Sequence, residues 1–299
     1  MNRILKQAAL LHTDIALLKL EAGKFSVPSN QIRVAFIDGR LVRQPYKPHW
    51  EFARRLINAV DPSPAEDPMA RQWYIASTAH MQSLRDLANA RKHLEDALKL
   101  FPDDAQILFY AGVLHEIWAS PLNQNFQSNL PVKPFYGSKE KELKQARKFY
   151  REVIDADPDF AEAYLRLGRV EGLLDSHPQA FVALERADSL IQEPLLSYYT
   201  ALFRGYEFEM LDRPEEAREQ YERASSLYPG AQSPRLALSP LAHSLGDTES
   251  ALDALRNLLD LQQKETGRDD PFWEYDLSHV RNAPDLIEKM HRVFGELPQ

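Results

Sequence analysis

The chain repeats one short pattern of apolar residues at a spacing of about 34 positions. In each copy an alanine is followed by an apolar residue four positions later and by another seven positions later. The alanines that begin the five copies are Ala90, Ala146, Ala180, Ala217 and Ala251. Two of the four steps between them are 34 residues, one is 37, and the first is 56, which is 34 plus an insertion of 22. Positions i, i+4 and i+7 share one face of a helix, so the pattern predicts five amphipathic helices.

A second helical segment precedes each of these five helices. The clearest is AEAYLRLGRVEGLL at 161–174, where Tyr164, Leu167 and Gly168 lie on one face. Because glycine has no side chain, Gly168 is predicted to let two helices approach closely. Proline ends three of the anchored helices, since it lacks the amide hydrogen that a helix interior needs. The chain is therefore predicted to fold as helix pairs in series.

These helix pairs resemble the tetratricopeptide repeat family across residues 71–265. The residues that carry the resemblance in one repeat are Tyr164, Leu167, Gly168, Ala180, Leu184 and Ala187. The resemblance implies an all-α fold, a right-handed α-solenoid of about five stacked pairs. It also implies that the first helix of each pair lines a concave groove. One pair cannot bury its apolar face alone, so stacked neighbours share a continuous core.

Residues 1–70 are predicted to form an N-terminal cap. The anchor spacing recurs from Ala53, which indicates a degenerate repeat. Within the cap, residues 31–44 carry Asp38-Gly39 between apolar positions. This dipeptide favours a type I′ turn and a small β-hairpin, and a plain loop is the alternative.

Two other stretches interrupt or end the repeats. Residues 119–138 contain three prolines and several Asn, Gln and Ser residues, which predicts an insertion without a continuous helix. Residues 266–299 are predicted to form a pair of capping helices. In that cap, Trp273 and Tyr275 would cover the core that the last repeat exposes.

No constellation of residues predicts catalysis. The chain has no cysteine, which excludes disulfides and thiolate zinc sites. It has no phosphate-binding glycine loop and no nucleophile elbow, and its nine histidines show no paired ligand spacing. His115 is interpreted as a structural histidine, and the pair Asp269-Asp270 as a cap at a turn or helix start. We therefore predict a non-enzymatic protein with no catalytic residue, no metal and no cofactor.

Charge and hydropathy argue against two classes of partner. The net charge is −8, with +6 over residues 1–60 and −14 over the remainder. This acidic body argues against nucleic acid as the main partner. No run approaches 18 apolar residues, so no membrane span is predicted. The first residues lack a signal-peptide pattern, which favours a cytoplasmic location. A periplasmic or secreted protein is the alternative if a signal peptide was removed before this numbering.

The stretch YYTALFRGYEFEML at 198–211 places three aromatic residues at helical spacing. By position in the repeat, the resemblance implies the partner-binding residues Tyr110, Arg166, Arg169, Tyr199, Phe203 and Tyr206. Aromatic rings beside guanidinium groups suit a peptide with apolar side chains and a carboxylate. The alternative is that these aromatics form a core stripe, because Arg204 stands where the family has a large apolar residue.

These observations predict a protein–protein interaction scaffold. Its groove would bind a peptide or a segment of a protein partner whose identity the sequence does not give. The first alternative is a structural subunit or a self-associating homo-oligomer. A more remote alternative is an enzyme in which residues 119–138 form a lid over a pocket.

Overall fold

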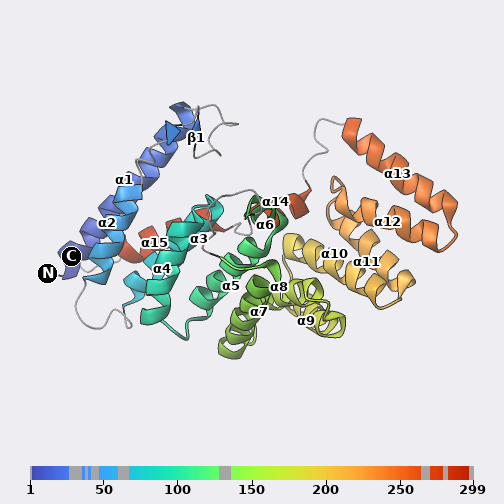
Figure 1. Ribbon diagram of the computed structural model, residues 1–299, viewed down its shortest axis with the longest axis horizontal. Coiled ribbons are helices and arrows are strands. Elements are labelled where there is room, and N and C mark those ends of the chain that lie inside the picture. Colours follow the sequence, from blue (N-terminus) through green and yellow to red (C-terminus); the bar gives the residue numbers. More distant parts are fainter. Residues whose placement is uncertain are drawn as a thin grey trace.

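A computed structural model describes residues 2–26, 36–37, 40–41, 47–59, 67–127, 136–263, 270–278 and 282–295. Within these ranges the fold is an all-α solenoid, which confirms the predicted fold class (Figure 1). The N-terminal helices are α1 (Asn2–Ser26) and α2 (Lys47–Asn58). The helices of the central region are α3 (Pro68–Ser83), α4 (Leu87–Leu100), α5 (Ala105–Ala119), α6 (Pro121–Gln127), α7 (Lys139–Ala156), α8 (Ala161–Leu173), α9 (His177–Leu190), α10 (Pro194–Met210), α11 (Pro214–Leu227), α12 (Ser233–Ser244) and α13 (Thr248–Gln263). The C-terminal helices are α14 (Pro271–Ser278) and α15 (Ala283–Gly295).

Five helix pairs follow one another along the arch that Figure 1 shows. They are α3 with α4, α5 with α7, α8 with α9, α10 with α11, and α12 with α13. At the N-terminal end α1 packs against α2. The short helix α6 lies in the insertion that separates α5 from α7. No helix in the described part of the chain is long and apolar enough to cross a membrane.

Two short strands lie between α1 and α2. Strand β1 (Phe36–Ile37) pairs antiparallel with β2 (Arg40–Leu41), so that Phe36 faces Leu41 and Ile37 faces Arg40. Each strand has two residues, and the rest of the stretch 31–44 lies outside the described residues. The hairpin across the whole stretch therefore stays a prediction, as do the domain boundaries at 70 and 265.

The alanine anchors lie at the packed face of the second helices. The side chains of Ala90, Ala146, Ala180 and Ala217 are fully buried. The bulky residue four positions after each of them is also buried, so each second helix presents one apolar face to the core. The last repeat differs, because Leu255 on α13 is 42% exposed.

Glycine allows the two helices of a repeat to pack closely, as the sequence predicts. A methyl group placed on Gly168 of α8 would lie 2.5 Å from Cγ of Leu184 on α9. The equivalent glycines Gly112 and Gly205 face the rings of Tyr150 and Tyr221 in the same way. The large residue four positions after the alanine anchor thus fills the space that the glycine leaves.

Replacing Gly168 by alanine is expected to lower the free energy of unfolding by about 1–3 kcal/mol. The new methyl group would meet Leu184 and, at 3.1 Å, the backbone oxygen of Ala180, so both helices must shift. Urea unfolding followed by circular dichroism measures the change. Gly230→Ala is the control, because no atom lies within 4 Å of its added methyl group. Equal destabilisation by both substitutions would contradict this explanation.

The turn inside a repeat has the same geometry in four of the five repeats. In each, one residue adopts a left-handed conformation; these residues are Arg85, Asp175, Asp212 and Gly246, with φ between 56° and 80°. The next residue donates its amide to a carbonyl five positions earlier, for example Ser176 to Glu171 at 2.9 Å. This bond is typical of the Schellman helix terminus. Only Gly246 is a glycine, so sequence reasoning did not find the motif.

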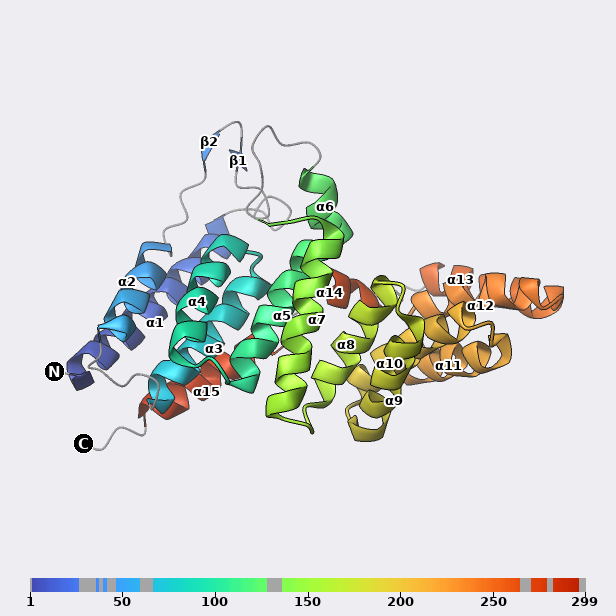
Figure 2. The ribbon, with the colours of Figure 1, turned by 60° about the horizontal axis from the view of Figure 1, so that its bottom comes forward.

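The C-terminal helices do not cap the last repeat, contrary to the sequence prediction. Helix α15 packs against α3 and α1, near the opposite end of the arch, and α14 lies against α5 (Figures 1 and 2). The residues of α15 that face the core are Ala283, Leu286, Met290 and Phe294. These apolar residues complete the core at the N-terminal end, which explains why the segment returns along the arch.

Candidate binding site on the inner face

The C-terminal helices lie against four of the first helices, because α15 packs against α3, and residues 270–278 contact α5, α8 and α10. We call the face that these four first helices present to them the inner face of the arch. We call residues 270–278 the α14 segment. Side chains from α5, α8 and α10 contact it directly. We call this set the α14 site; its members are Glu116, Arg166, Arg169, Tyr198, Tyr199 and Phe203.

Two of the predicted aromatic residues on α10 contact the α14 segment. The hydroxyl of Tyr199 donates to the carbonyl oxygen of Pro271 at 2.8 Å. The ring centroids of Tyr199 and Phe203 lie 5.1 and 5.4 Å from that of Tyr275. Phe203 also lies 6.1 Å from Phe272, edge to face. Because these neighbours cover them, Tyr199 and Phe203 are only 4% and 2% exposed.

Arg166 is held in a buried ionic cluster. Its guanidinium donates to Glu116 at 3.1 Å and to Glu162 at 2.9 and 3.0 Å. The same group lies over the ring of Tyr275, 4.9 Å from its centroid. Arg166 and Glu116 are each 2% exposed, so this pair is withdrawn from water.

Glu116 accepts hydrogen bonds from two tyrosine hydroxyls. Tyr150 donates to one carboxylate oxygen at 2.6 Å, and Tyr275 donates to the other at 2.5 Å. Burial raises the pKa of both tyrosines well above the ordinary value, and the negative charge of Glu116 raises it further. Both hydroxyls therefore keep their protons and serve as donors.

The remaining predicted residues differ in how they meet the C-terminal region. The guanidinium of Arg169 lies 4.8 Å from the ring centroid of Phe203 and 5.9 Å from that of Phe272. The hydroxyl of Tyr110 donates to Asn282, just before α15, at 3.0 Å. Tyr206 is 39% exposed, unlike Tyr199 and Phe203 on the same helix.

Asp270 fixes the start of the α14 segment. One carboxylate oxygen accepts from the hydroxyl of Tyr198 at 2.7 Å and from the amide of Phe272 at 2.9 Å. The other accepts from the amides of Gln232 and Ser233, at the start of α12, at 3.0 and 2.6 Å. A carboxylate at a helix N-terminus satisfies free amides and opposes the helix dipole. The capping interpretation of Asp270 is thus confirmed, and its carboxylate serves two helices.

The inner face is therefore occupied where the sequence predicts a groove for a guest. The two interpretations of the aromatic row, groove or core, do not exclude each other. Tyr199 and Phe203 lie on the inner face, and the α14 segment buries them there. Sequence reasoning missed Tyr198 and Asp270 as members of this contact, because residues 72 positions apart give no local signal.

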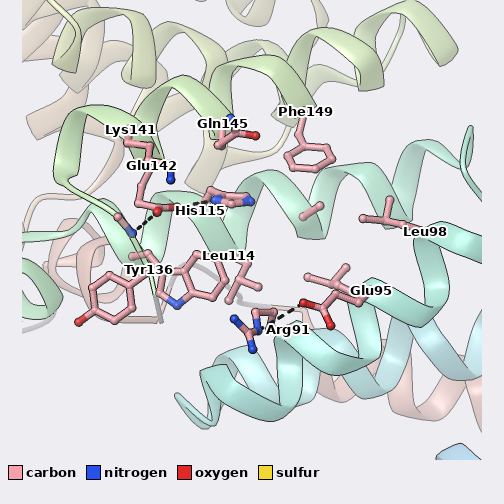
Figure 3. A pocket seen from close by; sticks show the side chains of 14 residues that line it. Arg91, Glu95, Leu98, Leu114, His115, Tyr136, Lys141, Glu142, Gln145 and Phe149 are labelled. Atoms are coloured by element: carbon pink, nitrogen blue, oxygen red, sulfur yellow. Dashed lines mark hydrogen bonds and ion pairs between the residues drawn. The ribbon is translucent and has the colours of Figure 1, made fainter. Parts of the chain in front are cut away.

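A separate hollow of about 500 Å³ lies between α4, α5 and α7 (Figure 3). Nδ1 of His115 lies 2.5 Å from Glu142, whose other carboxylate oxygen accepts from the amide of Gly137. Burial alone would raise the pKa of Glu142, but these two hydrogen bonds and nearby positive charge, including that of Lys141, together outweigh burial and lower the pKa below its ordinary value. The pairing agrees with a structural role for His115.

The composition of the hollow bears on the remote enzyme alternative. Tyr136 and Gly137, from the end of the insertion, line it together with His115. Among the described residues that line it there is no serine, threonine or cysteine, so His115 has no such nucleophile beside it there. Over the described part of the chain, no group of three His, Asp or Glu side chains is placed to hold a metal ion.

Comparison with known proteins supports the repeat assignment. The sequence pattern of the tetratricopeptide repeat matches residues 82–117, which contain α4 and most of α5. This match confirms the resemblance stated from the sequence. No curated protein sequence matches the chain.

Solved structures with the same fold have low sequence identity to the chain. PilF of Pseudomonas aeruginosa is 18% identical, with a TM-score of 0.51, and the match covers 76% of this chain and 91% of that one. MamA from Desulfovibrio magneticus RS-1 is 14% identical, with a TM-score of 0.51, and the match covers 66% and 97%. At these identities the likeness shows the fold alone.

Proposed function

We propose that the chain is a non-enzymatic protein-interaction scaffold and that the α14 site binds a short segment of a protein partner. The observation that supports this is the way the chain's own α14 segment is bound. It is held by hydrogen bonds and ring contacts from side chains of three first helices, α5, α8 and α10. Recognition of a short helix by pockets and side-chain donors is a common mode of peptide binding.

The α14 segment has the properties of a bound peptide. Its helix, α14, is eight residues long, and a helix of that length is marginal in water without tertiary contacts. Its conformation therefore depends on the site. Trp273, the third residue of the helix, is 53% exposed, so the site contacts only one face of the helix.

A partner must compete with the chain's own segment. A tethered segment acts at an effective concentration on the order of millimolar. A partner therefore binds in proportion to the fraction of molecules in which the α14 segment has left the site. Tyr110, Arg166, Arg169, Tyr199 and Phe203 remain our proposed contacts for the bound partner, and Tyr206 is proposed as an exposed contact at the edge.

Self-association is the second candidate function. Leu252 and Leu255 on α13 are 47% and 42% exposed, at the end of the arch that the described helices α14 and α15 do not cap. A terminal repeat of a solenoid normally needs a polar outer face for solubility. These leucines favour contact between the last repeats of two copies.

The scaffold function is tested in a chain that carries Phe272→Ala, which loosens the α14 segment. Into this background we place Arg169→Ala or, as a control, Arg256→Ala, whose side chain is 71% exposed on α13. Loss of the Arg169 guanidinium is expected to reduce recovery of a native partner about fivefold, because a cation–aromatic contact contributes about 1 kcal/mol. Affinity purification with quantitative mass spectrometry measures the recovery. Equal recovery with both variants rejects the site.

A further inference from the structure

The geometry points to the class of ligand that the α14 site takes. It is a short helix that begins Asp-Pro, with an aromatic residue two positions after the aspartate and a tyrosine five positions after it. Asp270, Pro271, Phe272 and Tyr275 show this pattern within the chain. The inference rests on the proposed function, because it names the partner segment for the same site.

The aspartate position is specified by three donors outside the bound helix. The hydroxyl of Tyr198 and the amides of Gln232 and Ser233 all point to the carboxylate of Asp270, which is 3% exposed. The same carboxylate also accepts a hydrogen bond from the backbone amide of Phe272 in its own helix. Aspartate is short enough to cap its own helix, and its second oxygen remains for α12. An alanine here would leave buried donors without this acceptor.

Side chains of α10 and α8 contact the next two positions of the bound helix, residues 271 and 272. Tyr199 donates to the backbone carbonyl of residue 271, a contact that does not depend on the side chain there. Proline is suited to the first helical position, since its missing amide needs no partner there. The centroid of the Phe272 ring lies 6.1 Å from that of Phe203 and 5.9 Å from the Arg169 guanidinium, so the ring contacts both groups. This position therefore favours an aromatic side chain.

The last position discriminates tyrosine from phenylalanine. The Tyr275 ring packs against Tyr199, Phe203 and the Arg166 guanidinium. Its hydroxyl donates to Glu116 at 2.5 Å, and Glu116 is 2% exposed. A hydrogen bond to a buried carboxylate is stronger than one between neutral groups. A site built to bind a hydroxyl rejects the analogue that lacks it, because the buried acceptor then loses its donor.

If an external ligand exchanges with the chain's own α14 segment, the same substitution should change the affinity for that ligand in opposite directions, depending on whether the chain or the ligand carries it. A substitution that weakens the α14 segment should tighten binding of a ligand added in trans, because more sites are vacant. The same substitution in the added ligand should weaken its binding. A permanent structural contact would show neither effect.

The experiment uses a fluorescein-labelled peptide with the sequence GRDDPFWEYDLSHV, residues 267–280, and the full-length chain. Anisotropy titrations compare the wild type with Tyr275→Phe, which loses the bond to Glu116. The matched control is Trp273→Phe, an aromatic change on the exposed face of the same helix. We expect the peptide to bind the Tyr275→Phe chain about tenfold more tightly than the wild type, as for one lost hydrogen bond. The Trp273→Phe chain should bind as the wild type does.

Peptide variants test the pattern itself. On the Tyr275→Phe chain, peptides carrying Asp270→Ala or Tyr275→Phe should each bind about tenfold more weakly than the unmodified peptide. A chain with Phe272→Ala, checked by circular dichroism for an intact fold, provides a second loosened background. Absence of binding to both loosened chains overturns the inference and makes α14 a permanent part of the core. Equal binding of all peptides also overturns it.

Failure of the inference and failure of the proposed function give different results. If the peptide binds but no native partner is recovered in an Arg169-dependent way, the inferred ligand class is supported and the proposed scaffold function is rejected. An Arg169-dependent partner without peptide binding keeps the function and rejects the ligand class.

Discussion

Replacement of Glu116 by alanine is expected to lower the free energy of unfolding by about 3–5 kcal/mol, the usual range for breaking a buried ion pair. Arg166 would keep Glu162 but lose Glu116. The hydroxyls of Tyr150 and Tyr275 would lose their acceptor while still buried. Each buried donor that loses its acceptor costs about 1–3 kcal/mol.

Urea unfolding monitored by circular dichroism checks this result. The free energy of unfolding of Glu116→Gln should lie between those of Glu116→Ala and the wild type. The amide oxygen of glutamine can still accept a hydrogen bond from a tyrosine, but it carries no charge. Glu140→Ala removes an exposed ion pair with Lys144 and serves as the control with no expected change. If Glu116→Ala unfolded at the wild-type urea concentration, the cluster would not stabilise the inner face.

The second large effect is a loss of stability on acidification, caused by His93 on α4. This side chain is 1% exposed, stacks on Trp73 at 5.1 Å between ring centroids and lies 2.9 Å from the hydroxyl of Ser77. Burial lowers the pKa of His93 to about 3. Nearby charges have smaller, opposing effects: Arg54 and Lys92 lower the pKa, and Glu51 and Asp96 raise it.

The direction of the effect follows from proton binding. Between the native pKa of about 3 and the ordinary value of 6.5, the unfolded chain binds more protons at His93 than the folded chain does. Stability is therefore full above pH 6.5 and falls as the pH decreases through this window. At pH 5 the loss is about 2 kcal/mol, from about 1.4 kcal/mol per pH unit.

Urea unfolding at a series of pH values from 7 to 4.5 measures this loss. His93→Phe keeps a ring against Trp73 but cannot titrate, so its stability should fall less steeply with acid. His243→Gln removes an exposed histidine from α12 and should keep the wild-type slope. If His93→Phe and the wild type had equal slopes, burial of a neutral His93 would not explain acid sensitivity.

The repeats could be predicted because their signal is local. Ala146, Tyr150 and Val153 lie within eight residues, and one helix face explains all three. The prediction of a close helix contact at Gly168 was correct for the same reason. The pattern recurs five times, so one irregular member such as Pro240 inside α12 does not hide it.

The position of the C-terminal segment could not be predicted in this way. Tyr275 is hydrogen-bonded to Glu116, 159 positions away, and Tyr110 is hydrogen-bonded to Asn282, 172 positions away. Phe272 and Tyr275 are apolar enough to cover the last repeat or to fill the inner face, and the sequence does not distinguish these surfaces. The aromatic row on α10 could be predicted from its helical spacing. The α14 segment that covers it could not, because the pattern on one helix does not identify what packs against that helix.

The return of the chain along the arch changes how the protein resists unfolding. In an ordinary solenoid each repeat contacts only its neighbours, so the terminal repeats can unfold separately and the superhelix can lengthen elastically. Here α15 contacts α1 and α3, while the preceding α14 segment is bonded to α5 and α10. This internal strap links repeats that are distant along the coil. It limits their elastic extension and couples their melting into fewer, larger cooperative units.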